Sequence, residues 1–166
     1  ITASYATGSV TGEIDVGGLI GENYESTITA SYAAGIVNGT SFVGGLIGKN
    51  NGIISANYTT GSVSGDFNIG GLIGYNYLGT INASYATGRV IGNVHVAGLI
   101  GYNEEGSITA SYWNIATSGQ ANGIGFSDSP VEETTLGLTS AQMTDKASFA
   151  AFDFPDSPTE QNWMIL

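Results

Sequence analysis

The chain lacks cysteine altogether and has few charged residues, and both features exclude classes of binding site. Without cysteine, its 166 residues can form neither a disulfide framework nor a thiolate metal site. Only 10% of the residues are charged, and three basic residues stand against fourteen acidic ones, which gives a net charge of −11. We therefore expect no nucleic-acid partner, because phosphate binding needs clustered lysine and arginine.

Long hydrophobic runs are also missing. None approaches the roughly 18 apolar residues of a membrane span, so we expect no membrane insertion. The sequence has no signal peptide and starts inside a repeat at Ile1, so we expect further repeats or a cap upstream. Low charge together with abundant Gly, Ser, Thr and Asn is typical of a secreted protein of a bacterial cell surface. We therefore expect an extracellular location.

The chain does have a repeat of about 27 residues. An Ala-Ser-Tyr or Ala-Asn-Tyr segment recurs with its tyrosine at Tyr5, Tyr32, Tyr58, Tyr85 and Tyr112, spacings of 27, 26, 27 and 27 residues. A Gly-Gly-Leu-Ile-Gly segment, with Ala replacing the first Gly in its last copy, keeps the same period at 17–21, 44–48, 70–74 and 97–101. A fixed period of this length predicts a stacked array, because one unit cannot bury its apolar side alone.

Each repeat contains three short extended runs separated by Gly or Asn, and no helical pattern precedes residue 138. These features predict an all-β solenoid (β-helix) with one repeat per coil, each coil adding about 4.8 Å. We expect the solenoid over residues 1–112 and an irregular capping segment over 113–166, packed on it as part of one structural domain. The recurring glycines are expected at corners. Aligned amides are expected from Asn23, Asn50, Asn76 and Asn103.

The first run alternates, with Ile28, Ala30 and Tyr32 on one side and Thr29 and Ser31 on the other. This alternation predicts a buried stack of the repeat tyrosines and an outward row of small polar residues. The predicted outward residues are Thr2, Ser4, Thr29, Ser31, Ser55, Asn57, Asn82, Ser84, Thr109 and Ser111. They would form a flat uncharged grid that resembles the ice-binding faces of β-solenoid antifreeze proteins. The alternative is that a secreted sheet simply carries small polar residues on its wet side.

The C-terminal segment departs from the repeat. The sequence Thr139-Ser140-Ala141-Gln142 is a capping-box pattern and predicts a short helix over about 140–150. A dense apolar finish follows at Phe152, Phe154, Trp163 and Ile165. Terminal units of solenoids must close the core, so we interpret this segment as a C-terminal cap.

Residues that could carry out chemistry are few. The single histidine, His95, cannot make a zinc site without further ligands, so a packing or solvated role is expected. Acid pairs occur at 104–105 and 132–133 and at Glu13 and Asp15, but no acid stands at the Asp15 position of the second repeat. EF-hand, glycine-rich calcium-binding and phosphate-loop patterns are absent. We expect no catalytic residues, no metal and no cofactor, and hence no enzyme.

The Tyr-Ala-Thr-Gly-x-Val-x-Gly run at 5–12 and 85–92, followed by Val-Gly-Gly-Leu-Ile-Gly at 16–21, resembles the GLUG-motif repeats. These repeats occur in large bacterial surface proteins, in adhesins and beside some secreted metallopeptidases. The resemblance implies a non-catalytic adhesive or spacer module whose partner is an extracellular surface, a glycan, a protein or ice. The alternatives are an ice-binding protein using the grid and, less strongly supported, the non-catalytic flank of a secreted hydrolase.

Overall fold

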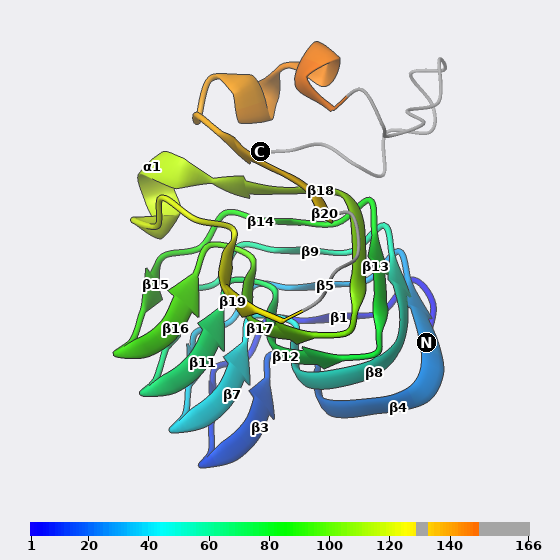
Figure 1. The fold of residues 1–166 in the computed structure, drawn as a ribbon, viewed down its shortest axis with the longest axis vertical. Helices are drawn as coiled ribbons and strands as arrows, with labels where there is room; N and C mark the ends of the chain where they lie inside the picture. The colour runs from blue at the N-terminus through cyan, green and yellow to red at the C-terminus, as the bar shows by residue number, and fades with distance from the viewer. Residues whose placement is uncertain (129–132, 150–166) are drawn as a thin grey trace.

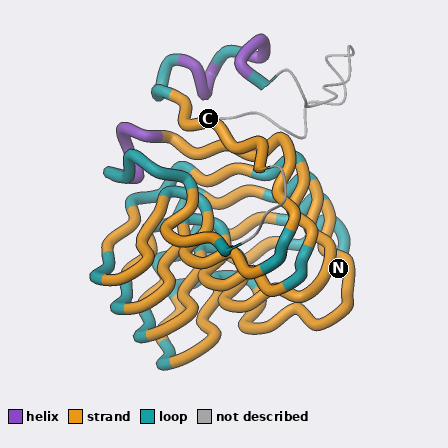
Figure 2. The backbone as a smooth tube through the Cα atoms, viewed as in Figure 1, coloured by secondary structure: helices purple, strands orange, loops and turns teal. Residues whose placement is uncertain are grey.

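The computed structural model describes residues 1–128 and 133–149 and shows a parallel β-solenoid (Figure 1). All its strand pairs are parallel and join each coil to the next, as in Tyr32 opposite Tyr58 and Val63 opposite Val90. The predicted fold class and the repeat of one coil per 26 or 27 residues are confirmed. Figure 2 shows the coils stacked with their strands in line and the helical turns gathered at one end.

Three parallel sheets run along the solenoid. The first contains β2 (Val10–Thr11), β6 (Val37–Asn38), β10 (Val63–Ser64) and β15 (Val90–Ile91). The second contains β3 (Ile14–Gly17), β7 (Ser41–Gly44), β11 (Phe67–Gly70) and β16 (Val94–Ala97).

The third sheet has twelve strands and forms the rest of each coil. It contains β1 (Tyr5–Ala6), β4 (Ile20–Thr29), β5 (Tyr32–Ala33), β8 (Ile47–Ser55), β9 (Tyr58–Thr59), β12 (Ile73–Tyr77), β13 (Thr80–Asn82), β14 (Tyr85–Ala86), β17 (Ile100–Glu104), β18 (Ser107–Asn114), β19 (Ile124–Ser127) and β20 (Glu133–Leu138).

Like residues stack on like residues through the core. Ile28, Ile54, Ile81 and Ile108 are fully buried and lie in register along the axis. A second apolar cluster contains the valines of the first sheet, including Val37, Val63 and Val90. Since each coil buries its apolar side chains against the same side chains of its neighbours, stacking supplies the core that one coil lacks.

The repeat glycines lie at corners as predicted, but the left-handed positions are taken by other residues. Twelve non-glycine residues have positive φ, among them Ala30 (φ 51°) and Phe42 (φ 54°), whereas Gly119 is the only such glycine among the described residues. The repeat glycines instead allow close approach, since a Cβ at Gly71 would lie 2.2 Å from the Gly98 carbonyl oxygen. Each coil also contains more strands than the three predicted runs, because left-handed residues such as Ala30 and Leu78 lie at breaks between strands.

The predicted column of asparagine amides is confirmed. The Nδ2 of Asn23 donates to the Oδ1 of Asn50, Asn50 donates to Asn76, and Asn76 donates to Asn103, each at 2.8 Å. All four side chains are buried, so these hydrogen bonds satisfy polar groups that burial would otherwise penalise.

The repeat tyrosines also stack, but they form a column separate from the main core. Ring centroids of Tyr32 and Tyr58 lie 4.8 Å apart with planes 9° from parallel. Burial increases along this column, from the exposed Tyr5 to the buried Tyr85 and Tyr112. The buried stack predicted for these rings is therefore present only at the C-terminal end.

Solenoid pairing continues past residue 112. Strand β18 runs through Trp113, and both β19 and β20 pair in parallel with the coil before them. Beside them lie helix α1 (Ile115–Ser118) and two 3-10 turns, η1 (Gln142–Thr144) and η2 (Lys146–Ser148). None of the helices that the structure describes has the length and apolar character needed to cross a bilayer.

The capping box forms as predicted, although a short 3-10 turn follows in place of a longer helix. The backbone N–H of Gln142 donates to Thr139 Oγ1, and the N–H of Thr139 donates to Gln142 Oε1. Buried Phe149 packs edge-on against the rings of Tyr85 and Tyr112. The predicted apolar finish at Phe152, Phe154, Trp163 and Ile165 lies outside the described residues.

Candidate functional site

The ten residues predicted to form one flat outward grid occupy two different environments. Six are accessible to solvent: Thr2, Asn82 and Thr109 are exposed, and Ser4, Thr29 and Ser55 are half-buried. The other four, Ser31, Asn57, Ser84 and Ser111, are fully buried. The expectation that all ten side chains face outward is wrong for these four.

The reason is the left-handed alanine in the middle of each run. Ala30 separates β4 from β5, so the backbone turns and the side chain that follows it points inward rather than outward. The buried side chains accept hydrogen bonds from backbone N–H groups of the preceding coil, as in Ser31 N–H to Asn57 Oδ1 at 2.9 Å. These residues are structural, and the ice-binding alternative, which needed the complete grid, is not supported.

Exposed apolar side chains also lie on the second sheet. Ile14, Ser41, Phe67 and Val94 are in register on β3, β7, β11 and β16. Ile14 is 62%, Phe67 49% and Val94 39% exposed. Ser41 interrupts this column, so Ile14 stands apart from the paired Phe67 and Val94. Large apolar side chains exposed side by side favour an interaction surface.

A column of aromatic rings adjoins it. Phe42 directly follows Ser41, and its ring stacks on Tyr75 with centroids 5.1 Å apart. Tyr75 in turn stacks on Tyr102 at 5.3 Å, and Phe126 packs edge-on against Tyr102. We call Ile14, Phe67, Val94, Phe42, Tyr75, His95, Tyr102 and Phe126 together the apolar-aromatic face.

His95 belongs to this face as a packing residue. Its ring lies 5.0 Å from that of Phe126, and its Nδ1 lies 2.7 Å from Asn68 Oδ1. This matches the packing role expected for it. Among the residues that the structure describes, no three His, Cys, Asp or Glu side chains cluster so that they could hold a metal ion.

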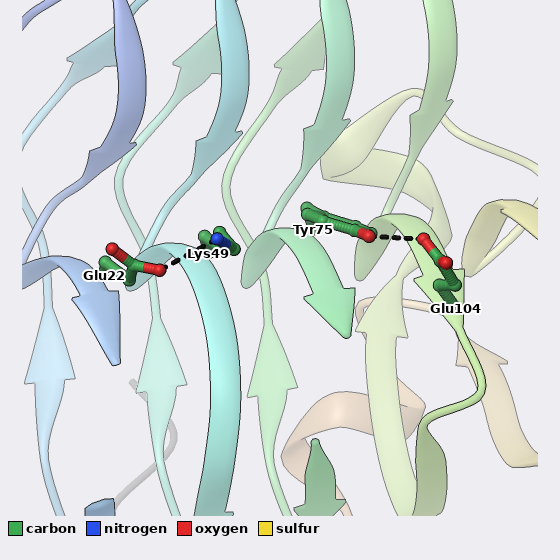
Figure 3. A network of polar contacts seen from close by, with 4 residues as sticks. All are labelled: Glu22, Lys49, Tyr75 and Glu104. Carbon is green, nitrogen blue, oxygen red and sulfur yellow. Dashed lines mark hydrogen bonds and ion pairs between the residues drawn. The ribbon is translucent and has the colours of Figure 1, made fainter. Parts of the chain in front are cut away.

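Polar groups border the aromatic column (Figure 3). The Tyr75 hydroxyl donates to the Glu104 carboxylate, and the Tyr102 hydroxyl donates to Asp128 at 3.0 Å. On the two preceding coils, the Lys49 ammonium pairs with the Glu22 carboxylate at 2.9 Å, in line with the first pair. Both phenol hydroxyls therefore donate to carboxylates of the protein. The Glu104 and Asp128 carboxylates lie at the border of the face, where their oxygens can accept further hydrogen bonds.

Burial sets the electrostatics of this region. Desolvation, and then the hydrogen bond to Glu104, raises the pKa of the Tyr75 phenol. Desolvation also raises the pKa of the Asp15 carboxyl, and the nearby Lys49 ammonium opposes this effect without cancelling it. Asp15 Oδ1 is buried without a hydrogen-bond partner, which fits that direction.

Comparison with protein families decides what kind of repeat this is. The model of the GLUG motif matches residues 65–91, from Gly65 before β11 to Ile91 at the end of β15. Residues 65–91 are a GLUG motif. The stacked coils repeat the residue pattern of this motif. Neither the curated proteins nor the solved structures gave a significant match to the chain.

Sequence reasoning missed the apolar-aromatic face because its key positions have unremarkable spacing. Phe42, Asn68 and His95 stand at one repeat position and all adopt positive φ. The residue type does not predict the left-handed backbone at Phe42, since a phenylalanine rarely takes this conformation. The available signal was the exposed apolar column itself, which the alternation around Val16, Val43 and Ile69 places on the outer side.

Proposed function

We propose that this chain is a non-catalytic adhesive module of a secreted bacterial surface protein, and that its apolar-aromatic face binds a neutral glycan surface. The GLUG motif and the solenoid fold support a repeat module. Low charge and the absence of cysteine support an extracellular setting.

The observation that carries this proposal is the exposure of Phe67 and Val94. Ser41 occupies the same register position one coil away, so the fold accepts a small polar side chain there. The exposed ring and branched side chain therefore contribute nothing that the core requires. Large apolar groups kept at the surface without a structural need favour an interaction surface.

The chemistry of the face favours a neutral glycan. Aromatic rings pack against the apolar C–H faces of sugars, and the bordering Glu104 and Asp128 carboxylates can accept hydrogen bonds from hydroxyl groups. The net charge of −11 repels anionic polysaccharides and nucleic acids. A rigid stack of coils holds these groups at fixed spacing, which lowers the entropic cost of binding a repetitive ligand.

The test is affinity electrophoresis of the full chain in gels that contain amylose, galactomannan or hydroxyethylcellulose, with alginate as an anionic comparison. We expect retardation by at least one neutral polymer and none by alginate. The double variant Phe67→Ser, Val94→Ser should lose this retardation, because it removes both apolar side chains and introduces the serine that the second coil has at the same register position, Ser41.

Ile36→Ser is the matched control. Ile36 is 52% exposed but lies in the first-sheet region, outside the apolar-aromatic face. It should leave retardation unchanged. Equal losses in both variants would indicate general surface hydrophobicity and would contradict the proposed face. Mobility unaffected by every polymer would favour a spacer over an adhesive module.

A further inference from the structure

A second site arises from the one irregularity of the repeat. The turn after each column asparagine has the residues Tyr24-Glu25-Ser26, Tyr77-Leu78-Gly79 or Glu104-Glu105-Gly106, whereas the second coil has only Asn51-Gly52. The other three turns contain a left-handed residue at Glu25, Leu78 or Glu105, and the second turn has none. The second coil is therefore one residue short at this corner.

The shorter turn leaves a cleft between its neighbours. Tyr24 pairs with Asn51 and Thr27 with Ile53, so Glu25 and Ser26 together face the single Gly52. The cleft has a volume of about 200 Å³, and turn residues of three successive coils line it. This volume is several times the roughly 30 Å³ that one water molecule takes up in the liquid.

The walls of the cleft are chemically unequal. Glu25 supplies a carboxylate on the first coil, and Ile53 and Leu78 supply aliphatic side chains that are each 51% exposed. Thr27 and Thr80 add hydroxyl groups. Within residues 1–128 and 133–149, Glu25 forms no ion pair or side-chain hydrogen bond, so its charge is available to a ligand.

We infer that this cleft binds the lysine side chain of a basic partner protein or peptide. The ammonium group pairs with Glu25 and donates to a threonine hydroxyl, while the four-carbon stem packs on Ile53 and Leu78. Arginine fits less well, because a guanidinium favours a bidentate carboxylate partner or an aromatic surface, and the cleft lining contains one carboxylate and no ring.

Charge complementarity supports the same occupant. The chain carries a net charge of −11, and none of its three basic residues lines the cleft. A basic partner is therefore attracted over a distance before contact. None of the residues that line the cleft belongs to the apolar-aromatic face, so the two sites can be tested by separate substitutions.

The experiment is an amide NMR titration of the full chain at low salt with acetyl-Gly-Gly-Lys-Gly-Gly-amide. The same peptide with norleucine in place of lysine keeps the stem and lacks the charge. We expect saturable shifts centred on Ser26, Gly52 and Leu78 with the lysine peptide and much weaker ones with the norleucine peptide. Equal responses to both peptides would overturn the inference.

Three variants sharpen the result. Glu25→Gln should weaken binding up to about fivefold, which corresponds to an exposed ion pair of at most about 1 kcal/mol. Glu105→Gln is its matched control, since Glu105 is exposed and holds the corresponding left-handed position in another turn. If Glu105→Gln weakens binding as much as Glu25→Gln, the attraction is unspecific and the site is refuted.

Inserting a leucine between Asn51 and Gly52 gives the second turn the length and pattern of the Tyr77-Leu78-Gly79 turn. It should fill the cleft and abolish the localised shifts while the fold persists, and retained binding would contradict the site. The double variant Phe67→Ser, Val94→Ser should leave the lysine titration unchanged, so that failure here and failure of the adhesive proposal remain distinguishable.

Discussion

The Nδ2 of Asn50 donates to the Oδ1 of Asn76 across the coil boundary at 2.8 Å, inside a fully buried corner. Asn50 also accepts from the Nδ2 of Asn23 and donates to the Gly52 carbonyl. Asn50 therefore uses both its donor and its acceptor, and the column adds a line of buried side-chain hydrogen bonds to the backbone bonds and apolar contacts between coils.

Asn50→Asp should be strongly destabilising. The substitution replaces a buried donor by a carboxylate that faces the Asn76 and Gly52 oxygens, so two acceptors lose their partner and a charge is buried. We expect a loss of about 3 kcal/mol in the free energy of unfolding, measured by urea denaturation. Asn51→Asp, at the neighbouring position outside the column, should change it by less than about 0.5 kcal/mol.

A stabilising change is expected at a left-handed alanine. Ala56 has φ of 56°, a conformation that costs an L-residue about 1–2 kcal/mol, whereas glycine adopts it freely. Ala56→Gly should therefore raise the free energy of unfolding by up to about 1 kcal/mol, even though glycine gains flexibility in the unfolded chain. Ala33→Gly, at a buried extended position, should lower it; a loss of similar size at both positions would show that the left-handed conformation carries no strain.

Asp15 should make stability depend on pH. Burial raises the pKa of the Asp15 carboxyl in the folded protein above its unfolded value of about 4. The contribution of Asp15 to the free energy of unfolding is therefore complete below pH 4 and is lost as the pH rises through the raised pKa, because the carboxyl must then ionise in a buried site. Asp15→Asn should remove this decline and stabilise the protein at pH 7 by at most about 1 kcal/mol, because solvent screens a partly exposed group. Unfolding curves between pH 3 and 7 measure the effect, with the exposed Glu13→Gln as the comparison that should keep the decline.

Phe149→Ala should detach the C-terminal turns from the solenoid. The ring is buried against Tyr85 and Tyr112, and truncating such a ring costs about 3–5 kcal/mol. Hydrogen exchange should then quicken in β18, whose tyrosine loses its cover. Leu136→Ala, at an exposed position on β20, should leave exchange in β18 unchanged. An equal effect of both variants would contradict a specific packing of Phe149 on the tyrosines.

The architecture could be predicted from the sequence because equivalent residues of successive repeats lie on one another in the stack, so the repeat period shows directly which residues pair. Tyr32 recurs at Tyr58 because one lies on the other, and the Asn50 column follows for the same reason. The interruption at Ala30 was not predictable in this way. Alanine has no preference for left-handed backbone, and it adopts this conformation only because the coils on either side require the turn.

That single backbone feature explains most of the error in the candidate site. Alternation through Ala30 places Ser31 beside Thr29, whereas the turn sends Ser31 into the interior and leaves Thr29 outside. The cleft at Gly52 was visible in the sequence as the one 26-residue spacing, but a missing residue can be absorbed anywhere in a coil. The register between Tyr24 and Thr27 shows that the missing residue is absorbed at this corner and leaves the rest of the coil in line.

The asparagine column also gives the molecule a direction. In every link the amide nitrogen belongs to the coil nearer the N terminus and the oxygen to the coil after it, so Asn23 turns its carbonyl side away from the rest of the column. Every link thus points the same way along the stack, so the two ends of the column are chemically different, with an amide oxygen facing outward at one and an amide nitrogen at the other.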